Sequence, residues 1–506
     1  MLHAIAWTKL HIEVDSSISE SLIILSDVHL GNDLNDFAAD AIRRSARVDA
    51  DLAALLEHYR DQPSPAGRWR LVIAGDLIDF VGMTIRARDG EVMTAPNLEE
   101  RAHGLGNTAD HARLKLRAVV ARHRIVFAAL AKFVAAGHSV TIVHGNHDVD
   151  FHWDSVKDEL RAILGELAPI GATAQADGAG GAATMAARVD FEPWFYYVGG
   201  LAYIEHGHQY DTLCSTEHVM APLSPMDPQR LVRSFSDVLL RWVVRPTRGV
   251  PEYGHEGMGV FDYVALGFGM GAGGVVRLAA RFAAAVVELF RVRRASLSQA
   301  ARVLREEQER RMASLALATR VGVERLRALA ALQVPPVTRS ARKILASVLL
   351  DRIALAVAAF TAVALLILAA PHHAWSWPML AVVLASWVLA HRFLSRQRSQ
   401  WFGEKLDNNE VLVERAGHLA RLFLTPFVVM GHTHTPARVA LAGGSATYVN
   451  VGSWHEPEPE PDAERPYRAA RTHLVIHPPA PGATAQAEFL AWSPAGPRLF
   501  RHPERA

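Results

Sequence analysis

The chain has 506 residues, with 53 Lys or Arg against 52 Asp or Glu, so its formal net charge is only +1. A chain of this length can bury a sizeable core and hold more than one structural unit. The balanced charge, without a basic tail or stripe, gives no reason to expect nucleic acid as a partner, and the single cysteine, Cys214, excludes intramolecular disulfides.

The first predicted strand is the apolar run at residues 22–25, which leads into two polar residues, Asp27 and His29. Strands that are buried on both faces read as short continuous apolar runs. In open α/β sheets, ligand-binding groups gather just beyond the carboxyl ends of such strands. Asp27 and His29 therefore lie where a binding site would be expected.

The same pattern, a buried strand followed by polar side chains, recurs four more times along the chain. Helical periodicity predicts a crossover helix over residues 36–59 before the second strand and another helix over about 111–136 before the third. Because the polar residues sit at the carboxyl ends of the strands, we expect them to converge. The residues that follow the four runs are Asp76 and Asp79, Asn146 and His147, His206 and His208, and His432 and His434.

A long stretch without further strands of this type separates His208 from the last of the five strands. We predict that residues 216–340 form a helical insertion, because three segments within them have helical periodicity: 228–244, 275–293 and 296–332.

Two uncharged runs follow the insertion, at residues 353–370 and 374–390, and Trp residues lie at the edges of the second. Runs of this length lie at the lower end of what spans a bilayer, and interfacial Trp is typical of spanning helices. We therefore predict a transmembrane helical hairpin within residues 341–400. Basic residues flank both outer sides, so the positive-inside rule places both ends on the cytoplasmic side of an inner (cytoplasmic) membrane. The alternative is a buried hairpin in a cytoplasmic protein.

The polar residues at the five strand ends are carboxylates, imidazoles and one amide, a set that suits manganese, iron or zinc. Seven such ligands are too many for one tetrahedral ion, but they suit two divalent ions that share a bridging carboxylate. Two ions held about 3.5–4 Å apart stabilise the attacking and leaving oxygens of an in-line displacement at phosphorus. The predicted metal ligands are Asp27, His29, Asp76, Asn146, His206, His432 and His434.

The ordered set of motifs resembles the calcineurin-like metallophosphoesterase superfamily over residues 20–212 and 426–455. The motifs are Asp27-Val-His29, Gly75-Asp76-Leu-Ile-Asp79, Gly145-Asn146-His147-Asp148, His206-Gly-His208 and Gly431-His432-Thr-His434. The resemblance implies an α/β fold, a four-layer α/β/β/α sandwich, built from residues 1–215 and 401–506. It also implies metal-bound hydroxide as the nucleophile and manganese as the expected metal. It further implies two ion sites that share Asp76. The ligands of the first site are Asp27, His29, Asp76 and His434, and those of the second are Asp76, Asn146, His206 and His432.

The resemblance also suggests roles for two residues that are not needed as metal ligands. His147 is the candidate for contacting the scissile phosphate, where it would stabilise developing charge or protonate the leaving oxygen. Asp79, the second acid of its motif, orients this histidine in the family.

Departures from family patterns bear on the substrate. Protein Ser/Thr phosphatases of the superfamily have Arg-Gly where this chain has Phe80-Val81, which argues against a protein substrate. The motifs are also similar to those of the UDP-2,3-diacylglucosamine hydrolase branch, which cleaves a lipid-linked pyrophosphate at the membrane. That branch has His-Gly-Asp in place of His206-Gly207-His208 and lacks so long an insertion.

The combined prediction is a membrane-anchored, dinuclear phosphohydrolase that acts on a phosphomonoester, a phosphodiester or a pyrophosphate, on a lipid- or nucleotide-linked substrate. The alternative is a catalytically silent membrane scaffold or binding protein that keeps the fold. Neither reading predicts an oligomeric state.

Overall fold

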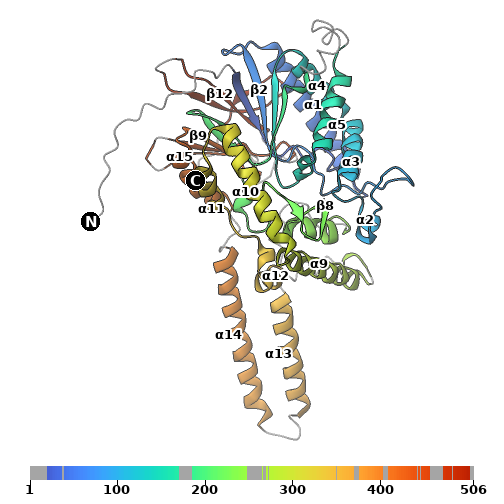
Figure 1. The fold of residues 1–506 in the computed structure, drawn as a ribbon. Coiled ribbons are helices and arrows are strands. Elements are labelled where there is room, and N and C mark those ends of the chain that lie inside the picture. Colours follow the sequence, from blue (N-terminus) through green and yellow to red (C-terminus); the bar gives the residue numbers. More distant parts are fainter. Residues whose placement is uncertain are drawn as a thin grey trace.

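The computed structural model describes residues 20–501, except 37–38, 170–184, 248–264, 266–268, 272, 349, 370–374, 403–407, 442, 445, 456–470 and 481–482. Within these residues the chain has a mixed α/β fold with a seven-stranded sheet, a five-stranded sheet and a two-stranded hairpin (Figure 1).

The seven-stranded sheet has the order β14-β13-β12-β1-β2-β3-β4. Its strands β1 to β4 are parallel to one another, whereas β12, β13 and β14 add antiparallel pairings at the β1 edge. The strands are β1 (Glu20–Leu25), β2 (Arg68–Ala74), β3 (Ser139–Val143), β4 (Val189–Glu192), β12 (Thr472–His477), β13 (Gln486–Ala491) and β14 (Arg498–Leu499).

Helices cover one face of this sheet and bury a large apolar cluster against it. They are α1 (Ala39–Asp61), α3 (Ala109–Arg122), α4 (Arg124–Ala135) and α5 (Asp154–Leu167), with the short α2 (Leu98–His103) and η1 (Val149–His152) in the connections. The predicted helix over 111–136 is in fact two helices that meet at His123. The break arises because the buried His123 side chain bonds to Asp49 and to the backbone of Gly31, which holds its backbone out of helical geometry.

The five-stranded sheet has the order β10-β11-β9-β6-β5, with β6, β9 and β11 parallel. Its strands are β5 (Phe195–Val198), β6 (Ala202–Glu205), β9 (Phe427–Met430), β10 (Ala437–Ala440) and β11 (Thr447–Asn450). Ala202 pairs with Phe427, so the sheet closes only when the chain returns after the insertion. Helix α15 (Asn408–Phe423) packs on this sheet together with residues of the insertion.

A third apolar cluster lies between the two sheets and joins them face to face. Leu22 and Ile24 of β1 belong to it, and so do Val429 of β9 and Val449 of β11; all four are buried. The carboxyl ends of the parallel strands in both sheets consequently point toward the same region, where the polar loops gather.

The insertion is mostly helical but not entirely so. Residues 228–231, predicted as part of a helix, belong instead to strand β8 (Asp227–Leu231). This strand pairs with β7 (Leu223–Ser224) across the turn at Pro225 and Met226. Proline at the turn and again at Pro228 favours this edge hairpin over a helix. The other elements that the structure describes between His208 and Ser347 are η2 (His208–Tyr210), α7 (Phe235–Leu239), the π-helical turn η3 (Leu240–Val244), α9 (Gly274–Ser296), α10 (Ala300–Thr319), α11 (Val323–Leu332), η5 (Val337–Arg339) and α12 (Ala341–Ser347).

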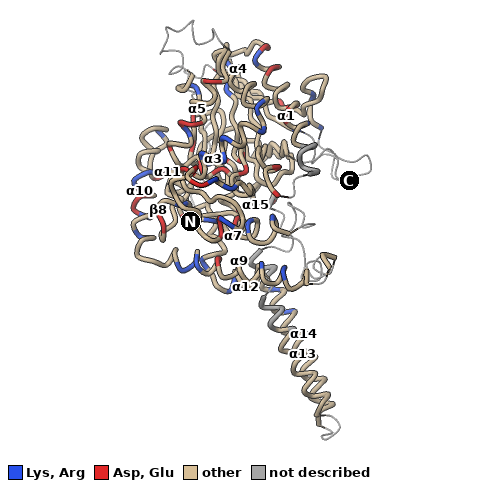
Figure 2. Tube along the Cα trace, turned by 90° about the vertical axis from the view of Figure 1, so that its right-hand side faces the viewer, with Lys and Arg blue, Asp and Glu red and all other residues tan. Residues whose placement is uncertain are grey.

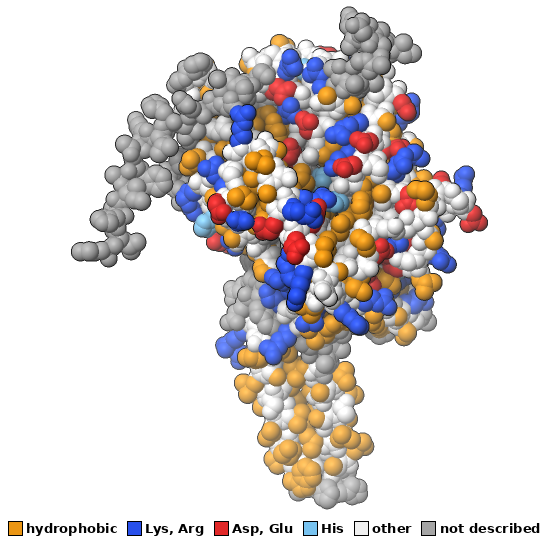
Figure 3. All heavy atoms as spheres, viewed as in Figure 1, with side chains coloured by type: hydrophobic (Ala, Val, Ile, Leu, Met, Phe, Trp, Pro, Cys, Tyr) orange, Lys and Arg blue, Asp and Glu red, His pale blue; other side chains and the backbone are white. Residues whose placement is uncertain are grey.

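Helices α13 (Leu350–Ala369) and α14 (Ser376–Phe402) form a hairpin that projects from the body of the molecule (Figures 1 and 2). Residues Ser376–Gln397 are long and apolar enough to cross a membrane, whereas the apolar part of α13, Val357–Ala369, is shorter. Apolar side chains cover the hairpin surface and basic ones gather where it meets the body (Figure 3). Phe360 is 76% exposed and Leu389 68%, so the described part of the hairpin is not buried core. The predicted link at Pro371 lies outside the described residues.

Candidate metal centre

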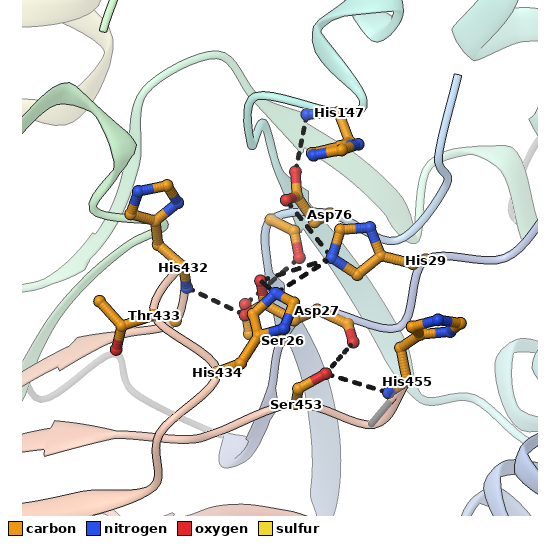
Figure 4. Close-up of polar contacts among 12 residues, drawn as sticks. Ser26, Asp27, His29, Asp76, His147, His432, Thr433, His434, Ser453 and His455 are labelled. Carbon is orange, nitrogen blue, oxygen red and sulfur yellow. Dashed lines mark hydrogen bonds and ion pairs between the residues drawn. The ribbon is translucent and has the colours of Figure 1, made fainter. Parts of the chain in front are cut away.

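The predicted ligands lie on loops that follow parallel strands of the two sheets. Asp27 and His29 follow β1, Asp76 follows β2 and Asn146 follows β3, while His206 follows β6 and the pair His432 and His434 follows β9. The loops are bonded to one another: the backbone N–H groups of Val28 and His29 both donate to the carbonyl of Asp76, at 3.0 and 2.9 Å. The sheets thus bring all seven residues to one end of the fold. Figure 4 shows Asp27, His29, Asp76, His432 and His434 among them.

The backbone at these loops is strained. Five of the seven predicted ligands have positive φ angles: Asp27 (55°), His29 (50°), Asp76 (56°), His432 (70°) and His434 (56°). Among the other non-glycine residues that the structure describes, only Arg320 and Leu424 share this conformation. Residues other than glycine rarely adopt positive φ angles, and backbone strain of this kind concentrates at functional sites. The fold therefore holds a costly backbone conformation in order to aim these side chains.

One group of ligand atoms comes from Asp27, His29 and His434. The Nε2 atom of His434 lies 3.1 Å from Oδ1 of Asp27 and 3.3 Å from Nε2 of His29. The Nε2 atom of His29 also lies 3.7 Å from a carboxylate oxygen of Asp27 and of Asp76. Asp27, His29 and His434 thus form one group that could hold a metal ion, and Asp76 lies beside it.

A second group adjoins the first through Asp76. The Nε2 atom of His206 lies 3.2 Å from Oδ2 of Asp76 and 3.1 Å from Oδ1 of Asn146. On the other side of the ring, Nδ1 of His206 donates to the carbonyl of Ala74 at 2.9 Å. A hydrogen bond of this kind fixes the tautomer that leaves Nε2 available to a metal. Asp76 thus lies beside both groups.

His432 lies at the edge of this arrangement. Its Nε2 atom is 3.1 Å from Oδ2 of Asp211, and its ring centre is 5.2 Å from that of His206. Asp211 and Cys214 form with His432 a further group whose ligand atoms lie within 4.8 Å of one another. Sequence reasoning did not select Asp211, although it lies five residues after His206 in the same polar run. Cys214 is buried, as expected.

The charges of the site fit a cation. Burial raises the pKa of a carboxyl group, but the imidazoles of His434 and His206 outweigh it at Asp27 and hold that pKa well below its usual range. Burial lowers the pKa of His206, but Asp76 and Asp27 raise it to about 9. The Oδ1 atom of Asp27 is buried and faces the imidazoles of His434 and His29, at 3.1 and 3.7 Å. A metal ion would replace the protons that now offset these carboxylates, so the buried groups could hold one.

His147 lies beside the ligands and is partly exposed, at 15% of its side chain. Its Nδ1 atom pairs with Oδ1 of Asp79 at 2.8 Å, and its ring meets that of His29 edge-on with ring centres 4.8 Å apart. Burial lowers the pKa of His147, but Asp79 and Asp76 raise it to about 10. The imidazole of His147 thus lies beside the cluster, and Asp79 holds it there.

Two further residues at the site were missed by sequence reasoning. Arg245, from the insertion, donates to Oδ2 of Asp79 at 2.7 Å. The ring centre of His455 lies 5.7 Å from that of His29. The Nε2 atom of His455 lies 2.8 Å from the side-chain amide nitrogen of Asn32. Arg245 belongs to no motif, whereas His455 follows the strand-like run at 446–450 by a few residues, as the other site residues follow theirs.

No protein-family model and no curated protein matches the chain. The description of the site therefore rests on its own geometry: buried aspartate and histidine groups, brought together by the ends of parallel strands, that could hold a metal ion.

Proposed function

We propose that the protein is a metal-dependent phosphoester hydrolase of the calcineurin-like metallophosphoesterase superfamily, with that superfamily's four-layer α/β/β/α sandwich. The observation that carries the proposal is the convergence of Asp27, His29, Asp76, His206 and His434, all but His206 in strained backbone conformations, with His147 and Asp79 directly beside them. Two sheets that share an apolar layer, each with helices packed against it, support the proposed sandwich.

The proposed ion sites are those that the motif resemblance implies. Asp27, His29 and His434 would hold one ion, Asn146 and His206 the other, and Asp76 both, with His432 reaching the second ion from its position beside Asp211. Manganese is the proposed metal, with iron or zinc as alternatives. Two divalent ions bound there would stabilise charge on phosphoryl oxygens and lower the pKa of water.

The chain's own contribution to the chemistry centres on His147. In hydrolysis, a water oxygen forms a bond to phosphorus while the bond from phosphorus to the leaving oxygen breaks, and the leaving oxygen takes up a proton. His147 is the partly exposed imidazole next to the ligands, and its hydrogen bond to the Asp79 carboxylate favours the protonated ring. Asp79 fixes the ring through Nδ1, so Nε2 is the atom that would give the proton.

The insertion favours a substrate larger than a simple phosphate ester. A cavity of about 960 Å³ lies between the α2 region, the β7–β8 hairpin and α9, and Pro336 and Thr338, just before the projecting hairpin, line one side of it. Thr216 and Val232 line both this cavity and a small one that reaches Asn146. The two cavities therefore share a wall, and the smaller one borders the loop that carries Asn146. We propose a lipid- or nucleotide-linked phosphoester or pyrophosphate as the substrate.

The exposed apolar surface of α13 and α14 supports a membrane anchor, with the catalytic body on the cytoplasmic side of the inner membrane. The proposal is tested by assaying the metal-loaded protein against phosphoesters and pyrophosphates, lipid-linked ones included. The alternative of a silent scaffold predicts bound metal without turnover of any of them; the partly exposed His147 and its hydrogen bond to Asp79 favour the enzyme.

A further inference from the structure

Four arginines of the insertion reach carboxylates of the core loops. We call them the arginine seam: Arg230, which pairs with Glu100; Arg233 and Arg241, which pair with Glu99 at 3.0 and 2.8 Å; and Arg245, which pairs with Asp79 at 2.7 Å. Burying charges is costly unless they are paired in good geometry. The insertion is thus attached to the core through specific, desolvated ion pairs, and one of these ends at the proposed catalytic pair.

Asp79 is held from both sides. Its Oδ1 atom receives hydrogen bonds from His147 Nδ1 at 2.8 Å and from the backbone N–H of Gly82 at 2.9 Å. Its Oδ2 atom receives one from Arg245 Nη2 at 2.7 Å. The Asp79 side chain is 1% exposed and that of Arg245 is 9% exposed. Water cannot readily replace the guanidinium, so the orientation of the carboxylate depends on Arg245.

The backbone around this contact is built for it. A Cβ atom on Gly82 would collide with the guanidinium of Arg245 and with Oδ2 of Asp79, so the approach requires glycine at this position. One turn earlier, Arg241 donates to the carbonyls of Val81 and Gly104 and anchors η3 on the core. Arg245 follows η3 directly, and its backbone N–H bonds to the carbonyl of Leu240 at 2.9 Å. The arginine is therefore delivered by a fixed element.

We infer that Arg245 is a positioning residue for His147, acting through Asp79, and that the insertion completes the proposed catalytic pair in addition to carrying the hairpin. This inference rests on the proposed function. Without Arg245, the Asp79 carboxylate loses the partner of one oxygen and can turn away from Nδ1 of His147. The imidazole then loses its fixed direction toward the leaving oxygen. The loops that carry the metal ligands keep the backbone hydrogen bonds from Val28 and His29 to Asp76.

The test compares two phosphate monoesters that differ in their need for a proton. p-Nitrophenolate leaves readily without protonation, whereas the alkoxide of ethyl phosphate requires it. Arg245→Met should lower kcat for ethyl phosphate by roughly tenfold or more beyond its effect on p-nitrophenyl phosphate, because general acid catalysis contributes about 10²–10⁴-fold. KM and metal content should stay close to wild type, and Arg245→Lys should recover part of the loss.

Arg233→Met is the matched control, because Arg233 belongs to the same seam and pairs with Glu99 but not with Asp79. Arg233→Met should change kcat for both substrates by the same factor. The inference would be overturned if Arg245→Met lowered kcat for both substrates by the same factor, or if it lost metal, because the residue would then act only through the fold.

A measurement on metal-free protein keeps the inference testable if the wild type hydrolyses neither substrate, a result that would count against the proposed function alone. Thermal unfolding of Arg245→Met, Asp79→Asn and the double variant should give shifts that are not additive, since residues in one buried network couple. Additive shifts would contradict the pairing of Arg245 with Asp79. The same cycle with Arg233→Met and Asp79→Asn should be additive.

Discussion

The Nε2 atoms of His29 and His434 lie 3.3 Å apart, although 405 positions separate the two residues along the chain. Two imidazole nitrogens at this distance share at most one proton, and both rings also face the carboxylate of Asp27. Such an arrangement is satisfied when a cation lies between the rings and the carboxylate. The contact also shows that the insertion and the projecting hairpin interrupt one fold, because the site needs residues from the segments on both sides of them.

Asp76 is expected to be the residue on which metal binding depends most, because its carboxylate faces both ligand groups. Asp76→Ala should abolish binding of both ions and all hydrolysis, as measured by elemental analysis and a phosphoesterase assay. Asp154→Ala, which removes an exposed carboxylate paired only with Lys157, serves as the control and should change neither. Full metal content in the Asp76 variant would refute its bridging role.

Asp211 should orient His432 toward the second ion. Asp211→Asn keeps the size of the side chain but weakens the hydrogen bond to Nε2 of His432. Changes to groups that orient metal ligands typically cost about 10- to 100-fold in metal affinity. Titration with a chelator should therefore release one ion per chain more readily from this variant and leave the other unchanged. Equal release of both ions would show instead that Asp211 acts on the whole site.

The contact between insertion and core should weaken in acid. Burial raises the pKa of Glu99, but Arg233 and Arg241 outweigh it and lower the pKa from 4.5 to about 2. Because the folded-state pKa is depressed, the stabilisation is fully present above about pH 4.5 and is lost as the pH falls toward 2, by about 3 kcal/mol in total. Chemical unfolding of wild type and Glu99→Gln at several pH values measures this effect.

The gap in unfolding free energy between the two proteins should be largest near neutral pH and should close toward pH 2. Glu324→Gln is the control, because Glu324 forms only an exposed pair with Arg327 and should show little gap at any pH. A pH-independent gap for Glu99→Gln would mean that the ion pairs with Arg233 and Arg241 do not stabilise the fold.

The projecting hairpin should be responsible for membrane association. Replacing residues 350–402 with a short Gly/Ser linker removes α13 and α14, whose described apolar side chains are largely exposed. Wild type should sediment with membranes and require detergent, whereas the variant should stay in the supernatant and keep its metal. A wild-type protein that is soluble without detergent would rule out the anchor.

The convergence of the candidate metal ligands could be predicted from the sequence because each follows an apolar run, and parallel strands in both sheets deliver their carboxyl ends to one place. Asp76 and His206 illustrate this, because both follow buried strands, β2 and β6. The packing of two sheets was expected from the motif resemblance and not from the apolar runs.

Other features depend on contacts that no local pattern encodes. Arg245 resembles any other arginine of a helical segment, and only packing of the insertion brings it to Asp79. The placement of His432 beside Asp211 depends on the course of the loop after β6. The break at His123 arises from a distant partner, Asp49, although the residues on both sides have continuous helical periodicity.

The central claim, that the site is a two-metal phosphohydrolase centre, is tested most directly by the turnover of p-nitrophenyl phosphate and bis-p-nitrophenyl phosphate by purified, manganese-loaded protein whose metal content is measured on the same sample. The account predicts two ions per chain and hydrolysis of at least one of the two esters, lost on chelation and restored by metal. Two bound ions with no hydrolysis of these esters or of any phosphoester or pyrophosphate, lipid-linked ones included, would contradict it.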